Sequence, residues 1–126
     1  MREPKFRVWQ RATHQYRHFV LKKGVSVNIR VDLEIEQSTG LKDKNGREIY
    51  EGDLIRILVS EDFRKEYLEE YHHEIPTGVC QVSFECGAYI VNQNDKYYLP
   101  IGQYRAEEIE VIGNIHENPE LLEAKA

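Results

Sequence analysis

Oxygen-bearing side chains crowd the segment between residues 43 and 53, where two glycine turns follow each other. The set is Asp43, Asn45, Glu48, Glu51 and Asp53. Oxygen donors at this density are typical of calcium sites, and an EF-hand loop needs acidic or amide ligands at positions 1, 3 and 5, glycine at 6 and glutamate at 12. With Gly46 at position 6, Leu41 falls at position 1 and Gly52 at position 12. The match fails, so we expect solvated turns here and no metal site.

Imidazole and thiol groups, the other common metal ligands, occur in two places. His72 and His73 are adjacent, so on a helix their side chains point about 100° apart, a poor arrangement for one metal. Cys80 and Cys86 lie on one predicted strand and its turn, with no third or fourth soft ligand nearby. We therefore expect small packing residues, no metal and no cofactor.

Nucleophilic catalysis would need a Ser, Cys or Thr in an activating context. The chain contains no Gly-x-Ser-x-Gly elbow and no phosphate-binding P-loop. Pairs of carboxylates occur throughout so acidic a chain, and they identify no acid–base site. The sequence predicts no catalytic residues. An enzyme of unrecognised type remains a third class of function, after an interaction module and a nucleic-acid-binding protein.

The first 30 residues form a basic arm with interleaved aromatic rings. They hold eight Lys and Arg against one acid, Glu3, for a net charge of +7, whereas residues 31–126 hold nine against 21, for a net charge of −12. Cations follow phosphates and rings stack on bases, so the arm could contact nucleic acid. It could instead lie against acidic groups of its own chain or of a neighbouring copy, and we rank this structural interpretation first. The candidate nucleic-acid contacts are Arg7, Trp9, Arg11, Arg17, Lys22 and Lys23.

The composition predicts one soluble domain over residues 1–126, because 40% of the residues are apolar and 31% are charged. No run approaches the roughly 18 apolar residues of a membrane span, and no signal-peptide stretch follows the N-terminus. Two cysteines without signs of secretion favour reduced thiols and a cytoplasmic location. Within the domain, residues 1–36 supply basic strands and one long strand, and residues 37–126 supply a barrel-like part.

The cleanest pattern lies between Val25 and Glu36. Every odd position there is Val, Ile or Leu, and every even position is polar. Period two predicts a long strand whose odd-numbered face is buried. Shorter strands are expected at residues 5–9, where polar and apolar residues alternate, and around residues 16–21.

Glycine turns divide the middle of the chain. Asn45-Gly46 predicts a two-residue hairpin, because both residues tolerate positive φ. Gly52-Asp53 leads into the apolar run at residues 54–59, which predicts an interior strand.

The last third reads as further strands. Residues 78–85 and 88–93 flank Cys86-Gly87 and predict a hairpin. Pro100 indicates an edge strand at residues 96–101, because proline cannot donate to a ladder. A strand at 108–115 then precedes a short C-terminal helical turn that begins at Pro119.

One helix interrupts the strands, at about residues 61–74. Ser60 is the predicted N-cap, and Pro76 stops the pattern. Aromatic residues recur at helical spacing along one stripe, which we take as a candidate oligomer contact: Phe63, Tyr67 and Tyr71. The fold class is therefore mainly β, a small β-barrel or sandwich with SH3-like features, one inserted helix and a short C-terminal helical turn.

Three stretches resemble the YopX family of phage and prophage proteins. They are Lys5-Phe-Arg-Val-Trp9, the run from Thr39 to Asp53, and Glu110-Val-Ile-Gly-Asn-Ile115 with Glu117-Asn-Pro-Glu-Leu-Leu122. The resemblance spans nearly the whole chain and implies a mainly β protein of mobile elements, without an assigned activity or catalytic residues. The regular strand at 25–36 and the inserted helix depart from the family pattern. The turn residues of the matching motifs are Asn45, Gly46, Gly52, Asp53, Gly113 and Asn114.

The sequence, with the phage origin and bacterial host that this resemblance implies, favours a phage-derived, non-catalytic interaction module in the cytoplasm of a bacterial host, acting as a homo-oligomer. Its partner is another copy of itself, with a host or phage protein as a further possibility and no membrane. The alternative is a nucleic-acid-binding accessory protein that uses the basic aromatic arm.

Overall fold

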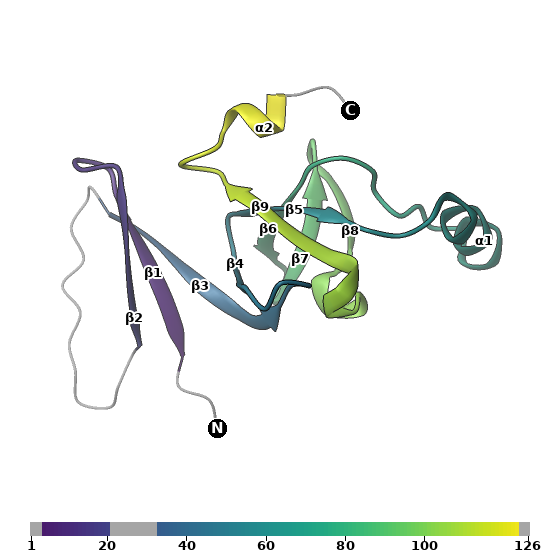
Figure 1. Ribbon diagram of the computed structural model, residues 1–126, viewed down its shortest axis with the longest axis horizontal. Helices are drawn as coiled ribbons and strands as arrows, with labels where there is room; N and C mark the ends of the chain where they lie inside the picture. The colour runs from purple at the N-terminus through teal and green to yellow at the C-terminus, as the bar shows by residue number, and fades with distance from the viewer. Residues whose placement is uncertain (1–3, 21–32, 124–126) are drawn as a thin grey trace.

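The protein consists of two antiparallel β-sheets with one exposed helix, shown in a computed structural model that describes residues 4–20 and 33–123 (Figure 1). One sheet has four strands in the order β2-β1-β3-β4, and the other has five in the order β8-β7-β6-β5-β9. The strands are β1 (Lys5–Gln10), β2 (Gln15–Val20), β3 (Leu33–Lys42), β4 (Glu48–Tyr50), β5 (Asp53–Ile57), β6 (Cys80–Glu85), β7 (Ala88–Gln93), β8 (Lys96–Pro100) and β9 (Ile109–Asn114). The predicted mainly β class is confirmed, in a sandwich-like arrangement whose described strands do not close into a barrel.

The main core belongs to the five-stranded sheet. Leu54 and Ile55 are consecutive in β5 and point to opposite faces, yet both are 0% exposed, so β5 is covered on both sides. This confirms the predicted interior strand. Short 3₁₀ turns at Ile101–Gln103 and Ala106–Glu108 lead from β8 back to β9. The buried core cluster comprises Ile49, Ile55, Ile57, Ile75, Cys80, Val82, Val91, Ile101, Ile109 and Val111.

Two hairpins of this sheet have two-residue turns. Cys86 and Gly87 both have positive φ, 50° and 83°, which is the conformation of the turn that suits twisted strands. The predicted hairpin of β6 and β7 is therefore confirmed. Asn94 and Asp95 make a second such turn, between β7 and β8, that the sequence analysis did not anticipate. β8 lies at the edge of its sheet, as Pro100 predicts.

The turn at Asn45-Gly46 differs from its prediction. Only Gly46 has positive φ, and its N–H donates to the Asp43 carbonyl at 3.0 Å. The connection from β3 to β4 runs from Asp43 to Arg47, so it is a longer loop in place of a two-residue turn. The Asp43 carboxylate explains the difference, because it accepts bonds from Asn45 and Arg47 N–H groups, both at 2.9 Å.

A strand is present at the described end of the predicted long strand, but the predicted burial of its odd-numbered face is wrong there. β3 continues beyond Glu36 to Lys42, and its 25–32 portion lies outside the described residues. Glu36, at an even position, is 6% exposed, whereas odd-numbered Ile35 is only partly buried. Glu36 is buried because it pairs with Arg7 of β1, and period two alone does not reveal such a partner.

Helix α1 (Glu61–Tyr71) is shorter than predicted. Ser60 caps it as expected, with its Oγ accepting the Phe63 N–H at 3.1 Å. The helix ends before residue 74 because His72 adopts the left-handed conformation, with φ of 58°. The chain then turns inward, and Ile75 joins the core at 8% exposure.

The two ends of the molecule carry different elements. Figure 1 shows β1 and β2 at one end of the long axis and α1 at the other, with the five-stranded sheet between them. The expected C-terminal helical turn is present as α2 (Glu120–Glu123). No helix within residues 4–20 and 33–123 is long and apolar enough to cross a membrane.

Candidate functional site

A buried guanidinium joins the two sheets. Arg7, in the middle of β1, is 7% exposed. Its Nε donates to Glu36 Oε1 at 2.7 Å, its Nη1 lies 2.7 Å from Asp53 Oδ1, and its Nη2 donates to the Glu51 carbonyl at 3.2 Å. Burial alone would lower the pKa of Arg7, but the carboxylates of Asp53 and Glu36 outweigh it and raise that pKa. The cation is therefore fixed and neutralised inside the protein.

Aromatic rings enclose this guanidinium. Its central carbon lies 4.4 Å from the ring centroid of Tyr16 and 4.9 Å from that of Tyr50, within cation–π range. The Tyr16 hydroxyl also donates to Glu36 at 2.9 Å. Burial raises the pKa of Tyr16, against the lowering effect of Arg7. Tyr16 is thus held neutral as a hydrogen-bond donor to the carboxylate.

The turn at Glu51-Gly52-Asp53 is built around the same charged centre, which comprises Arg7, Glu36, Asp53 and Tyr16. The Asp53 carboxylate accepts the Tyr50 N–H at 2.8 Å with one oxygen and pairs with Arg7 through the other. Glu51 accepts the Gln37 N–H of β3 at 2.9 Å. Gly52 has φ of 85° and leaves the space that the Glu36 carboxylate occupies. Each residue of this motif therefore has a structural task.

His116, from the C-terminal segment, packs beside the charged centre, and the sequence did not predict this role. Its ring stacks on Trp9, with centroids 4.9 Å apart and planes 9° apart. Its Nε2 lies 2.9 Å from Glu34 and 3.4 Å from Glu36, although neither contact has hydrogen-bond geometry. The only available signal was its place inside the Glu110–Leu122 motif, which gives no partner.

Two side-chain caps explain the remaining motif positions. Asp43, 3% exposed, binds its own loop with one oxygen and accepts the Val111 N–H of β9 at 2.9 Å with the other. Asn114 accepts the N–H groups of His116 and Glu117 at 3.1 and 2.8 Å. The sequence predicts Gly113 and Asn114 as turn residues, but they lie at the end of strand β9, immediately before the turn. A side chain at 113 would collide with Asn118.

The residues predicted to contact nucleic acid lie in different environments in the structure. Arg7 and Trp9 are buried, at 7% and 5% exposure, and they face the charged centre. Arg11 is exposed but lies 3.0 Å from the Glu34 carboxylate. Arg17 is exposed and donates to the Gln10 side chain at 3.3 Å. Lys22 and Lys23 lie outside the described residues. The described arm therefore pairs largely with acidic groups of its own chain, as the structural interpretation predicts.

The predicted oligomer residues form one stripe on α1. The ring centroids of Phe63 and Tyr67 are 6.2 Å apart, and those of Tyr67 and Tyr71 are 4.8 Å apart. Tyr67 packs against the core, but Phe63 and Tyr71 are 44% and 53% exposed. Leu68 adds a further exposed apolar side chain at 44%, and no residue of α1 is buried. The helix therefore leaves about half of the surface of these three apolar side chains in solvent.

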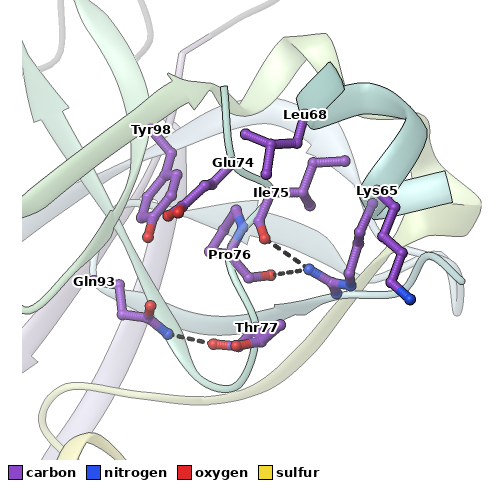
Figure 2. A pocket seen from close by; sticks show the side chains of 9 residues that line it. Lys65, Leu68, Glu74, Ile75, Pro76, Thr77, Gln93 and Tyr98 are labelled. Carbon is purple, nitrogen blue, oxygen red and sulfur yellow. Dashed lines mark hydrogen bonds between the residues drawn. The ribbon is translucent and has the colours of Figure 1, made fainter. Parts of the chain in front are cut away.

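Arg64 attaches this helix to the body. Its guanidinium donates to the carbonyls of Ile57, Ile75 and Pro76 at 3.0, 2.8 and 2.7 Å. Figure 2 shows the bonds to Ile75 and Pro76 among the residues that line a pocket beside the helix. Three charge-assisted bonds to one side chain hold α1 in place even though its outer face has little contact with the core.

The pocket beside α1 has a volume of about 400 Å³. Two of its polar side chains are already engaged, because Arg64 binds two carbonyls of the wall and Gln93 donates to the carbonyl of Thr77 (Figure 2). Gln93 also donates to the carbonyl of Val79. A ligand would have to break these bonds to be recognised. The lining residues are Arg64, Lys65, Leu68, Glu74, Ile75, Pro76, Thr77, Gln93 and Tyr98.

Metal-ligating and nucleophilic groups are dispersed in the part of the chain that is described. There, no three His, Cys, Asp or Glu side chains are grouped so as to hold a metal ion. Both thiols are free, Cys80 buried and Cys86 exposed. Burial raises the pKa of the Cys80 thiol to about 11, so this group stays protonated and unreactive at neutral pH.

Comparison with known proteins identifies the family. Residues 10–123 match the family model described as YopX protein. The chain is similar to the crystal structure of protein EF1440 from Enterococcus faecalis, with 26% identity, a TM-score of 0.59, and coverage of 94% of this chain and 97% of that one. It shares its fold with protein yopX from Bacillus subtilis, at 22% identity, a TM-score of 0.53 and the same two coverages. No curated protein matches it. On these grounds, the chain belongs to the YopX family.

Proposed function

We propose that this chain is a non-catalytic interaction module, encoded by a phage or prophage, that acts in the cytoplasm of a bacterial host as a homo-oligomer. The exposed apolar surface of α1 is the observation that carries the proposal. Phe63, Leu68 and Tyr71 are all at least 44% exposed on a helix that Arg64 and Tyr67 attach to the body. A small domain rarely leaves such a surface uncovered unless it binds something.

The surface continues from α1 onto the edge of the five-stranded sheet. Leu68 lines a second hollow together with Tyr97 and Leu99 of β8. Tyr97 is 55% exposed, and no further described strand pairs with the outer edge of β8. Exposed rings beside an open edge are suited to protein contacts.

The distribution of the motif residues supports the same proposal. Asp43, Gly52, Asp53 and Asn114 are engaged in internal bonds or close packing, so they build the scaffold. Three of the exposed large apolar side chains, Phe63, Leu68 and Tyr71, lie instead on α1. This division of roles favours a binding function over catalysis.

Light scattering during size exclusion tests the proposal. The expected mass at micromolar concentration exceeds that of one 14.9 kDa chain. A monomer over the whole micromolar range would contradict homo-oligomerisation.

A nucleic-acid-binding accessory protein is the second candidate. The observation in its favour is that residues 4–20 contain four Lys and Arg but no Asp or Glu. Arg17 is the exposed cation of this segment that has no carboxylate partner among the described residues. Arg7 and Trp9 would take no part, because they are buried.

Fluorescence anisotropy with labelled single- and double-stranded oligonucleotides tests this candidate. Binding through phosphates must weaken between 50 and 200 mM salt, by about a thousandfold if about six phosphates are contacted. Arg17→Ala should weaken it further. Absence of binding at low salt would remove this candidate.

A further inference from the structure

The two ends of the molecule carry opposite charge. Helix α1 holds five Asp and Glu against two Lys and Arg, one of which is the internally bonded Arg64. Residues 4–20, which form the β1–β2 hairpin, hold four Lys and Arg and no acid. Three of these cations pair with Glu48, Glu36 and Glu34 of the same chain, so Arg17 is the cation that this end leaves without a carboxylate partner among the described residues. Figure 1 places these two elements at opposite ends of the long axis, so they cannot meet within one chain.

Each end combines its charge with aromatic surface. On α1, Glu70 points about 20° and Glu66 about 60° from Phe63 around the helix axis, so acid and ring share one flank. On the hairpin, Phe6 and Phe19 stack across the two strands with centroids 5.3 Å apart. Arg17 lies two residues before Phe19 and is therefore on the same face of the sheet.

The opposite face of the hairpin is already occupied. Arg7, Trp9 and Tyr16 project from that side into the charged centre with Glu36 and His116. The Phe6–Phe19 face is thus the side of the hairpin that points away from this centre. It offers two partly exposed rings and one exposed cation.

Charge decides between symmetric and head-to-tail association. Pairing α1 with α1 would bring five acids against five acids, whereas pairing two hairpins would place the exposed Arg17 of one copy near that of the other and leave the acids of α1 without a partner. Like charges placed opposite each other cost several kcal/mol across an interface. Pairing α1 with a hairpin instead places Glu66 and Glu70 against Arg17, and rings against rings.

We infer that the occupant of the α1 surface is the β1–β2 hairpin of a second copy of this chain, so that copies associate head to tail. The inference rests on the proposed homo-oligomer and specifies its geometry. Because the α1 surface and the hairpin surface differ, an open assembly has one free α1 surface at one end and one free hairpin surface at the other. The assembly therefore either closes into a ring or grows as a filament.

Charge reversal at each end tests this geometry, with sedimentation velocity as the readout. Arg17→Glu alone, and Glu66→Lys with Glu70→Lys, should each raise the dissociation constant by about tenfold or more. An equimolar mixture of the two variants should associate again, because each supplies the surface that the other lacks. Combining all three changes in one chain should likewise restore self-association.

The outcomes separate the inference from the proposed function. A monomeric wild-type chain would contradict both. A wild-type oligomer that Arg17→Glu leaves unchanged would overturn the head-to-tail geometry alone and indicate a symmetric α1 interface. If Arg17→Glu abolishes oligonucleotide binding while the mass is unchanged, the hairpin binds nucleic acid and the inference is likewise wrong.

Discussion

The carboxylate of Glu36 lies where a side chain at position 52 would have to go. A Cβ at residue 52 would collide with Oε2 of Glu36, and Gly52 also has φ of 85°. The strand that carries Glu36 belongs to one sheet, and the turn that carries Gly52 leads into the other. The glycine of this motif is therefore required by the position of the Glu36 carboxylate, which comes from the other sheet, as well as by its own backbone.

Gly52→Ala should be strongly destabilising for these two reasons. Gly87 is a matched control, because its φ of 83° is similar but nothing lies within 4 Å of its missing side chain. We expect Gly87→Ala to lower the free energy of unfolding by about 1 kcal/mol and Gly52→Ala by about 3 kcal/mol. Urea denaturation followed by circular dichroism measures both. Equal losses would show that the Glu36 contact does not matter.

Arg7→Met should leave the Glu36 and Asp53 carboxylates buried without a counter-ion. Breaking a buried pair in this way costs about 3–5 kcal/mol. Arg11→Met is the control, because its pair with Glu34 is largely exposed and contributes at most about 0.5 kcal/mol. Trp9, the single tryptophan, stacks on His116 beside the site, so its fluorescence in urea reports the change. Similar losses for both variants would contradict the role assigned to Arg7.

These interactions also show which features of the fold can be predicted from the sequence and which cannot. Turn residues such as Gly87 and Pro100 predicted their strands because each restricts the local backbone. The pairing of Arg7 with Glu36 joins residues that are distant in sequence, and alternation of residue types carries no information on such partners. The same limit applies to His116, whose contacts depend on where the C-terminal segment returns to β1. The α1 stripe was predictable because helical spacing is local.

The two thiols should react differently. Burial holds the pKa of Cys80 at about 11, while Cys86 is exposed in its turn. Iodoacetamide at pH 8 should therefore modify one thiol per native chain and two per unfolded chain. Mass spectrometry counts the adducts, and Cys86→Ser should leave the native chain unmodified. Rapid native modification of Cys80 would show that the core opens easily.

Stability should fall at alkaline pH. Burial raises the pKa of Tyr104 to about 12, above its ordinary value near 10, so ionisation favours the unfolded chain as the pH rises between these values. Stability from this group is complete below pH ~10 and is lost toward pH ~12. Tyr104→Phe should reduce the loss between pH 9 and 11 by about 1 kcal/mol. Urea denaturation at both pH values measures it, and an unchanged loss would contradict the burial of this hydroxyl.

The central claim is that α1 presents the binding surface while the motif residues build the scaffold. Sedimentation velocity of a Phe63→Ser, Tyr71→Ser double variant tests it most directly, with Phe84→Ser as the control because Phe84 is a comparably exposed ring, at 52%, on β6. We predict that wild type and Phe84→Ser sediment as oligomers and that the α1 variant sediments as a folded 14.9 kDa monomer. An α1 variant that retains the wild-type sedimentation coefficient would contradict the account.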